Sequence, residues 1–259
     1  MKQTANFITL LNLVFGCLAI VFSLQGVWQW VEDTNQLAGY RVELQTEQIC
    51  LASLFIALAA VADFFDGFVA RLTGASGEMG KQLDSLADVV SFGVAPSVII
   101  FQFLRLSLAK EEDGLSASFL WLMPAFILAA SAAWRLARFN IDQSTPAYYF
   151  RGTPVPSVGV TVAAFPLIWW QANTQWEIDL LTNKWALYAL VGIFSWLMVS
   201  NLPIMSNKPA KKGLSGFFHH LCVLAVAILT GLFLGWWAVP VTFAAFVIFS
   251  ILFNKSITQ

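Results

Sequence analysis

The sequence predicts an all-α polytopic membrane protein with about eight transmembrane helices, and two observations support this. Hydrophobic residues make up 58% of the 259 residues and charged residues only 11%, whereas a soluble domain carries about 25% charged residues. The apolar residues are also gathered in long runs, and a helix needs about 20 of them to cross a bilayer. Because backbone groups in lipid must be hydrogen-bonded within their own segment, we expect each run to be a helix.

Eight apolar stretches follow one another along the chain. In order, they run over approximately Phe7–Leu24, Ile49–Arg71, Asp84–Leu104, Phe119–Asn140, Pro154–Gln171, Trp185–Pro203, Phe217–Trp237 and Val239–Phe253. The first is too long for the apolar region of a cleaved signal peptide, so we expect a retained helix. Almost nothing separates the last two around Pro240, which predicts a tight hairpin. We therefore expect a six-helix core over residues 1–205 and a C-terminal transmembrane hairpin over residues 206–259.

Basic residues are distributed unevenly between the loops, which predicts the orientation of the helices. Eight crossings place both termini on one side. With that side cytoplasmic, ten basic residues face inward and four face outward, which fits the positive-inside rule. The inward residues would be Lys2, Arg71, Lys81, Arg135, Arg138, Arg151, Lys208, Lys211, Lys212 and Lys255, and the outward ones Arg41, Arg105, Lys110 and Lys184.

Net charge and cysteine content exclude some classes of function. The formal net charge of −1 gives no basis for a nucleic-acid partner. The three cysteines, Cys17, Cys50 and Cys222, lie far apart in or beside apolar runs, and they form neither a disulfide framework nor a zinc-binding spacing.

Four aspartates interrupt the apolar pattern at the ends of the second and third stretches. Asp63 and Asp66 are three residues apart, and Asp84 and Asp88 are four apart, so each pair lies on one face of its helix. The segment Thr73–Gly77 between the helices has the composition of a turn. The two helices should therefore form a hairpin whose carboxylates face each other. Ionisable residues at membrane depth are costly and usually functional.

Four converging carboxylates would repel one another unless cations balance them. Carboxylate oxygens are hard ligands that suit Mg²⁺ or Mn²⁺, and two divalent ions would neutralise the four charges. Gly67, Ala70 and Gly80 keep the two faces free of bulk, so a phosphate-bearing ligand could approach the backbone. A purely structural explanation, with aspartates as helix caps or ion pairs, is less favoured because only Arg71 and Lys81 are nearby as cations.

Residues 63–88 carry the string D-x-x-D-G-x-x-A-R-x8-G-x-x-x-D-x-x-x-D. This string resembles the signature of the CDP-alcohol phosphatidyltransferases at all eight specified positions. The resemblance implies a bundle of six core helices, usually dimeric, with the active site open to the cytoplasm. It also implies an integral protein of a bacterial plasma membrane, in contact with membrane lipids.

Within that family, the chain is most similar to the integral-membrane phosphatidylserine synthases. One departure is Ala5, where a proline often precedes the asparagine. The similar segments are Asn6–Asn12, Asp84–Pro96, Arg135–Asn140 and Phe150–Pro156.

The resemblance implies a donor, an acceptor and a set of site residues. The donor would be CDP-diacylglycerol and the acceptor L-serine, giving phosphatidylserine and CMP with two divalent ions as cofactors. Asp63, Asp66, Asp84 and Asp88 would bind the metals, and Asp88 would also act as general base for the serine hydroxyl. The donor would be bound by Thr9, Asn12, Gly67, Ala70, Arg71 and Gly80, and the acceptor by Arg138, Asn140, Arg151 and Gly152, with Arg138 as the first choice for the serine carboxylate.

Two other functions stay open at this point. Another member of the same family would use glycerol 3-phosphate, inositol phosphate or choline as acceptor, and the metal motif cannot separate these from serine. A divalent-cation transporter is a candidate of a different class, because aspartates in membrane helices also mark ion pathways. Against transport, all four aspartates gather at one membrane face.

Overall fold

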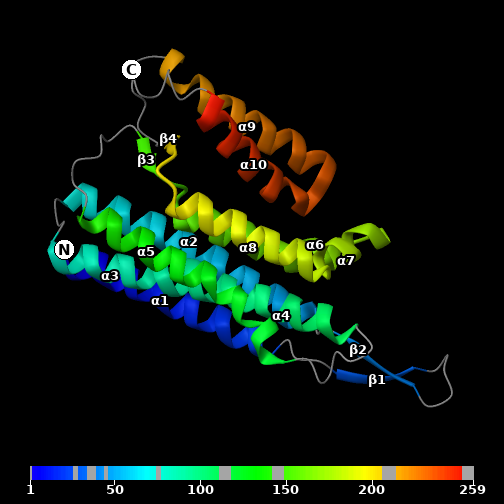
Figure 1. The fold of residues 1–259 in the computed structure, drawn as a ribbon. Helices are drawn as coiled ribbons and strands as arrows, with labels where there is room; N and C mark the ends of the chain where they lie inside the picture. Colours follow the sequence, from blue (N-terminus) through cyan, green and yellow to red (C-terminus); the bar gives the residue numbers. More distant parts are fainter. Residues whose placement is uncertain are drawn as a thin grey trace.

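The chain folds into a bundle of long helices (Figure 1). The computed structural model describes residues 2–25, 29–33, 39–43, 46–73, 77–110, 118–141, 149–205 and 214–252. The helices, in order, are α1 (Lys2–Gln25), α2 (Thr46–Thr73), α3 (Glu78–Asp88), α4 (Ala95–Ala109), α5 (Ile127–Ile141), α6 (Val155–Gln171), α7 (Gln175–Leu181), α8 (Lys184–Val199), α9 (Leu214–Leu234) and α10 (Ala238–Leu252).

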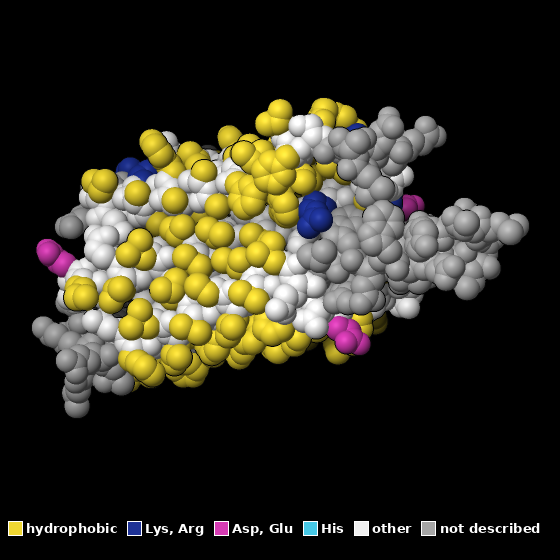
Figure 2. Space-filling model, turned by 90° about the horizontal axis from the view of Figure 1, so that it is seen from below, with side chains coloured by type: hydrophobic (Ala, Val, Ile, Leu, Met, Phe, Trp, Pro, Cys, Tyr) yellow, Lys and Arg dark blue, Asp and Glu magenta, His cyan; other side chains and the backbone are white. Residues whose placement is uncertain are grey.

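The predicted all-α membrane fold is confirmed, although the count of eight crossings is not. Among the described residues, five helical stretches are long and apolar enough to span a membrane, or six if α7 and α8, which meet at 61°, form one span. The apolar helix α6 has only 17 residues. Hydrophobic side chains cover the middle of the face seen in Figure 2, and charged ones lie nearer its ends, as lipid contact requires.

The third apolar stretch begins earlier than predicted and is not a regular helix. It starts at Glu78 in α3, passes through a π-helical segment η1 (Val89–Val94) and continues as α4. Wide turns of this kind occur frequently at functional sites. A Cβ added to Gly16 of α1 would lie 2.8 Å from the Ser91 Cα, and one added to Gly159 of α6 would lie 2.9 Å from the Phe92 Cα. Two glycines thus let α1 and α6 hold η1 closely.

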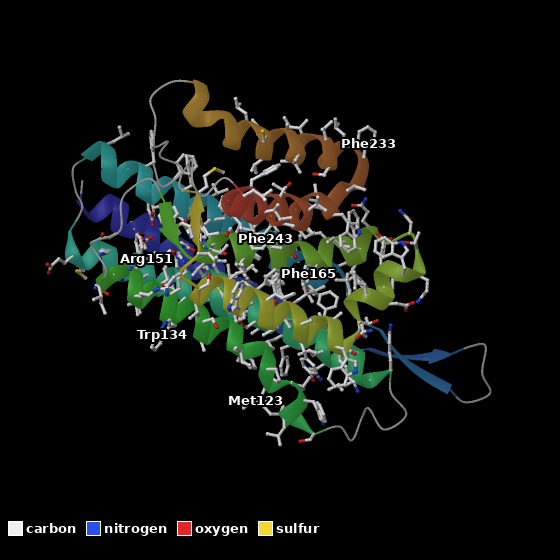
Figure 3. The ribbon with its side chains drawn as sticks, turned by 45° about the horizontal axis from the view of Figure 1, so that its top comes forward. Met123, Trp134, Arg151, Phe165, Phe233 and Phe243 are labelled. Atoms are coloured by element: carbon white, nitrogen blue, oxygen red, sulfur yellow. The ribbon has the colours of Figure 1, made fainter. Side chains whose placement is uncertain are left out.

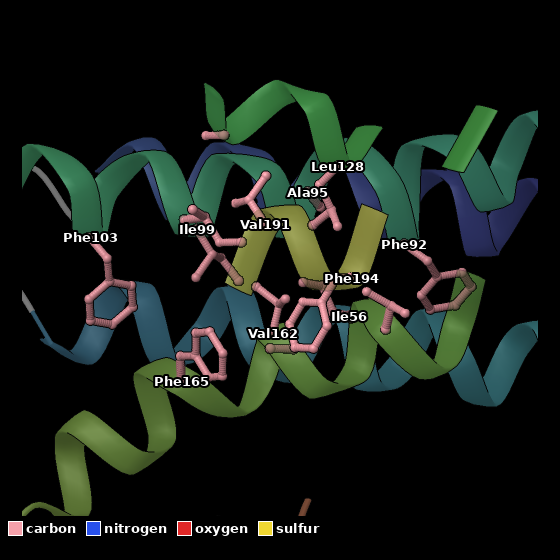
Figure 4. Close-up of a cluster of buried hydrophobic side chains, with 14 of the residues drawn as sticks. Ile56, Phe92, Ala95, Ile99, Phe103, Leu128, Val162, Phe165, Val191 and Phe194 are labelled. Carbon is pink, nitrogen blue, oxygen red and sulfur yellow. The ribbon is translucent and has the colours of Figure 1, made fainter. Parts of the chain in front are cut away.

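The apolar core lies where the continuous α3–η1–α4 element meets α2, α6 and α8. Figure 4 shows Phe92 and Ile99 beside Val162 of α6, Ile56 of α2 and Phe194 of α8. The first four side chains are fully buried and Phe194 is nearly so. This packing fixes the two helices that carry the aspartates relative to the rest of the bundle.

The C-terminal hairpin forms as predicted, but its turn is not at Pro240. The turn is the 3-10 segment η5 (Gly235–Trp237), where Gly235 has a φ of +57°. This positive φ favours glycine, and a Cβ there would also displace the end of the Gln171 side chain. Pro240 lies in the first turn of α10, where its missing N–H needs no helical partner.

The hairpin packs against the bundle through α10. Phe243 of α10 lies on the side that faces the bundle, whereas Phe233 of α9 lies on the far side (Figure 3). The rings of Phe243 and Phe194 meet edge-on, with their centroids 5.5 Å apart. At the turn, the Trp237 Nε1 donates to Glu177 Oε1 at 2.7 Å. The division of the chain into a core over residues 1–205 and a hairpin unit over residues 206–259 stays a prediction.

Several short elements were not predicted. Strands β1 (Gln29–Asp33) and β2 (Gly39–Glu43) pair antiparallel, as do β3 (Tyr149–Arg151) and β4 (Pro203–Met205). Strands of three to five residues are too short to show an alternating pattern. The 3-10 segments η3 (Phe119–Trp121) and η4 (Met123–Phe126) precede α5, where the sequence predicts one continuous helix.

The bundle has two distinct ends. The start of α1, the end of α10, β3 and β4 lie at one end, and β1, β2 and α7 lie at the other (Figure 1). We call the first the aspartate end, because the end of α2 and the start of α3 also lie there.

Candidate active site

Three of the four predicted aspartates converge at the aspartate end. Asp63 and Asp66 come from α2 and Asp84 from α3, and each offers a carboxylate oxygen within 4.8 Å of the others. The Oδ2 of Asp66 and the Oδ1 of Asp84 are buried and have no hydrogen-bond partner among the described residues. The predicted convergence of carboxylates from these two helices is therefore confirmed for three of them.

Asp88 lies one helical turn beyond Asp84 and is not part of this three-carboxylate cluster. Its side chain is only 6% exposed, and it is near enough to Asp63 and Asp84 for electrostatic interaction. Its Oδ1 accepts a hydrogen bond of 3.3 Å from the Nδ2 of Asn12 on α1. Burial and a single amide donor give Asp88 a different environment from the other three.

The first helix supplies two polar side chains to the carboxylates. The Thr9 hydroxyl donates to Asp66, and Asn12, three residues later on the same face, donates to Asp88. The Asn12 Oδ1 is buried without a partner in the described part of the chain. Ser91, which sequence reasoning missed, donates its hydroxyl to the Asn12 carbonyl at 3.0 Å. The predicted donor residues Thr9 and Asn12 therefore lie at the site.

The glycines of the motif have different surroundings. A Cβ added to Gly67 would meet nothing within 4 Å, so the space beside it is open. A Cβ added to Gly80 would lie 3.2 Å from the Asn6 Oδ1. The side chains of Ala70 and Arg71, both predicted to bind the donor, lie outside the described residues.

Asn140 joins the end of α5 to α3. Its Nδ2 donates to the Ser85 Oγ at 2.8 Å, and its carbonyl accepts from the Lys81 Nζ at 3.2 Å. Its Oδ1 is buried and has no partner among the described residues. Asn140, a predicted acceptor residue, thus lies beside the helix that carries Asp84.

Arg138, our first choice for the serine carboxylate, is engaged elsewhere. Its two terminal nitrogens donate to the Val199 carbonyl at 2.7 Å and to the Ser200 carbonyl at 3.1 Å, at the end of α8. They also donate to the Arg151 carbonyl and the Asn201 side chain, both at 3.3 Å. Both ends of the guanidinium fork are occupied, so the structure favours a role in holding α8 and β3 over one in binding the acceptor.

The other two predicted acceptor residues, Arg151 and Gly152, lie in β3 and against the end of α8. The Arg151 side chain is exposed at the end of β3 (Figure 3). Gly152 is buried with a φ of +74°, and its N–H donates to the Leu202 carbonyl at 2.9 Å. A Cβ on Gly152 would overlap the Met198 carbonyl and lie 2.9 Å from that of Ser200. This glycine lets the chain cross the end of α8.

Arg135 has the environment that was expected of Arg138. Its side chain is 6% exposed, its Nε has no partner among the described residues, and it interacts electrostatically with Asp88. Its guanidinium also lies over the Phe139 ring at 6.0 Å. Arg135 and Arg138 are three residues apart, so the sequence places both on one face but cannot tell which one is engaged by carbonyls.

Comparison with known proteins places this arrangement in a family. The model of the CDP-alcohol phosphatidyltransferase family matches residues 2–244. This chain belongs to the CDP-alcohol phosphatidyltransferase family. The match includes both aspartate helices and most of the C-terminal hairpin.

Several curated relatives carry the name CDP-diacylglycerol–serine O-phosphatidyltransferase. The relative from Helicobacter pylori is 32% identical over 81% of this chain and 86% of its own length. The one from Mycobacterium leprae is 31% identical over 77% of this chain and 65% of its own length. The one from Saccharomyces cerevisiae is 36% identical over 59% of this chain and 49% of its own length. The chain therefore matches only about half to two thirds of the longer relatives.

The residues present fit the divalent metal ions that CDP-alcohol phosphatidyltransferases use. Three carboxylates from two helices offer hard oxygen ligands within a small space. Two of their oxygens are buried and unpartnered within the described chain, which is unfavourable unless a cation or water is bound there. The cluster of Asp63, Asp66 and Asp84 can therefore hold metal.

Proposed function

We propose that this family member transfers the phosphatidyl group of CDP-diacylglycerol to the hydroxyl of L-serine, giving phosphatidylserine and CMP. The observation that carries the proposal is the carboxylate cluster beside the separate, amide-bonded Asp88. The names of the curated relatives support serine as the acceptor. The protein is an integral membrane protein, and we place the reaction at the cytoplasmic face of a bacterial plasma membrane.

The donor would bind where α2 and α3 meet. Asp63, Asp66 and Asp84 would hold two divalent ions, Mg²⁺ or Mn²⁺, with Asp88 adjacent to them. When bound, these ions hold the pyrophosphate and offset the charge that develops on the leaving CMP. The open space beside Gly67 lets a phosphate approach the helix backbone.

Asp88 would act as the general base. As the serine oxygen bonds to the lipid-side phosphorus, the bond from that phosphorus to the CMP oxygen breaks, and CMP leaves with the electron pair. The hydroxyl proton passes to the Asp88 carboxylate. The amide of Asn12, bonded to the Asp88 Oδ1, would fix the direction of the carboxylate. A positioned base of this kind contributes about 10²–10⁴-fold to the rate.

Arg135 replaces Arg138 as the proposed partner of the serine carboxylate. Its Nε is free of partners among the described residues, and it interacts with Asp88. A guanidinium can grip a carboxylate through two parallel hydrogen bonds. Asn140, with its unpartnered Oδ1 in the described structure, is a second group that could contact the acceptor.

The test is an acceptor panel. Purified protein would be incubated with CDP-diacylglycerol, Mg²⁺ or Mn²⁺, and either L-serine, glycerol 3-phosphate, inositol phosphate or choline. We expect CMP and phosphatidylserine with serine only. A lipid built from another acceptor would overturn the choice of serine and keep the family reaction.

A phosphorylated acceptor is less well supported by the charges at the site. Such an acceptor should need more basic side chains than serine does. Among the described residues near Asp88, Arg135 is a buried guanidinium, whereas Arg138 is engaged by carbonyls.

Transport of divalent cations is also less well supported. Between Asp88 and the opposite end of the bundle, Phe92, Ala95 and Ile99 are fully buried in an apolar core. Protein that moves Mn²⁺ across vesicle membranes without releasing CMP would contradict the enzymatic proposal.

A further inference from the structure

A short two-stranded ribbon, β3 and β4, lies between the C-terminal hairpin and the helices of the site (Figure 1). Phe150 of β3 pairs with Ile204 of β4, and Arg151 pairs with Pro203. Along the chain, β3 comes shortly before α6, and β4 comes shortly after α8. The position of the ribbon therefore depends on what holds its two sides.

On one side, the ribbon is held by a hydroxyl of the hairpin. The N–H of Met205, the last residue of β4, donates to the Ser250 Oγ of α10 at 3.2 Å. That hydroxyl in turn donates to the Phe246 carbonyl at 2.7 Å, so its acceptor lone pairs face the ribbon. Ser250 is fully buried. The hairpin thus satisfies a buried N–H that the paired strands leave open.

On the other side, the ribbon is held by Arg138 of α5. The guanidinium joins the Arg151 carbonyl of β3 to the Val199 and Ser200 carbonyls of α8. The adjoining Gly152 rests on the same end of α8. Together these hydrogen bonds connect the end of α5 to the end of α8 and to β3.

Arg138 links this clamp to the reaction site. It is one turn beyond Arg135, whose buried guanidinium interacts with Asp88. A shift of β3 would pull on Arg138 and hence on the turn of α5 that carries Arg135. The hydrogen bonds from Ser250 therefore run through β4 and β3 to Arg138. Arg138 shares one turn of α5 with Arg135, which interacts electrostatically with Asp88.

We infer that Ser250 of α10 is a positioning residue for the acceptor side of the active site, acting through the β3–β4 ribbon and Arg138. The inference rests on the proposed function, because it assigns the acceptor to the side of Arg135. It gives the C-terminal hairpin a part in acceptor binding beyond anchoring the chain in the membrane.

The test compares Ser250→Ala with Ser250→Thr, which keeps the hydroxyl. We expect Ser250→Ala to raise the KM for serine about 2- to 10-fold, as the loss of one hydrogen bond would. The KM for CDP-diacylglycerol should stay the same, and Ser250→Thr should restore the serine KM. Thr230→Val is the matched control, because the Thr230 hydroxyl bonds the Val226 carbonyl of its own helix α9.

Hydrogen exchange gives a readout that does not depend on activity. In Ser250→Ala, the amides of residues 149–153, 204 and 205 should exchange faster than in the wild type, and in Thr230→Val they should not. If Ser250→Ala does not accumulate, Ser250→Cys keeps nearly the same volume with a weaker acceptor and serves in its place.

Two results would overturn the inference. Unchanged exchange in the ribbon would show that Ser250 does not hold it. Faster exchange with an unchanged serine KM, or with an equal rise in both KM values, would show that the ribbon does not position the acceptor. A wild-type protein that makes no phosphatidylserine would instead contradict the proposed function, and the exchange data would still decide whether Ser250 holds the ribbon.

Discussion

At the scale of single residues, five of the eight described side chains that bury an unpartnered polar atom lie at the site. Asn12, Asp66, Asp84, Arg135 and Asn140 each bury a side-chain nitrogen or oxygen without a partner in the described chain. Buried polar atoms are normally hydrogen-bonded, so a group of exceptions at one end of a bundle points to a ligand. The aspartates could be predicted from their spacing alone.

The pairing of Asn12 with Asp88 could not be predicted in the same way. The two residues are 76 positions apart, and no local pattern records which helix faces which. Which of Arg135 and Arg138 is available to the acceptor also depends on packing. A sequence pattern does not show which side chain the carbonyls at the end of α8 will contact.

The two arginines should respond differently to substitution. Arg135→Lys should weaken the acceptor contact by about 1.5–3 kcal/mol, which is a roughly 10- to 150-fold rise in the serine KM. An ammonium cannot copy the paired hydrogen bonds of a guanidinium. The KM for CDP-diacylglycerol should change little. Steady-state kinetics with both substrates varied would check this.

Arg138→Lys is the matched comparison. It should lower the thermal unfolding temperature in detergent more than Arg135→Lys does, because Arg138 holds four backbone carbonyls and one side chain. If the serine KM rises more in Arg138→Lys than in Arg135→Lys, Arg138 and not Arg135 binds the serine carboxylate.

At the scale of elements, apolar runs predicted the helices and failed at the irregular segments. Hydropathy records that a segment is buried in lipid or protein, so α1, α2, α6 and α8 were predicted to within a few residues. The π-helical turn of η1 lies where α1 and α6 pack closely against it, and no run of apolar residues encodes such a turn. The position of the hairpin turn was wrong because Gly235, not Pro240, reverses the chain.

Gly152, between β3 and α6, is a position where the backbone leaves little room for a side chain. Gly152→Ala should destabilise the protein by at least about 1–2 kcal/mol, because its φ of +74° is unfavourable for a residue with a Cβ. The added methyl group would also overlap carbonyls at the end of α8. Thermal unfolding in detergent would measure the change.

Gly192→Ala in α8 is the control for this substitution. A Cβ at Gly192 meets nothing within 4 Å, and alanine is favoured over glycine in a helix by about 1 kcal/mol. We expect this variant to be as stable as the wild type or more so. Equal destabilisation in both variants would contradict the account of Gly152.

At the scale of the whole molecule, the two ends of the bundle differ in chemistry. The aspartate end carries the carboxylates together with Lys81, Arg135 and Arg138, and the other end carries Arg105, Lys110 and Lys184. The sequence predicted the first end to be cytoplasmic from its excess of basic residues. This orientation stays a prediction.

Cysteine labelling in intact cells would test the orientation. In a variant without Cys17, Cys50 and Cys222, a new cysteine at Gly77 should be protected from a membrane-impermeant reagent. One at Asn173 should be labelled. Both positions are exposed, and a Cβ at Gly77 meets nothing within 4 Å. Labelling at Gly77 with protection at Asn173 would reverse the proposed orientation.

The central claim is that carboxylates of α2 and α3 form a metal-dependent site for phosphatidyl transfer to serine. The most direct measurement is phosphatidylserine formation by EDTA-treated protein as Mn²⁺ or Mg²⁺ is added back, in the wild type, Asp63→Asn and Asp179→Asn. Asp179 is an exposed carboxylate on α7, at the other end of the bundle. We predict no product without metal, full recovery in the wild type and Asp179→Asn, and none in a folded Asp63→Asn. Product formation that survives EDTA, or near-normal activity in Asp63→Asn, would contradict the account.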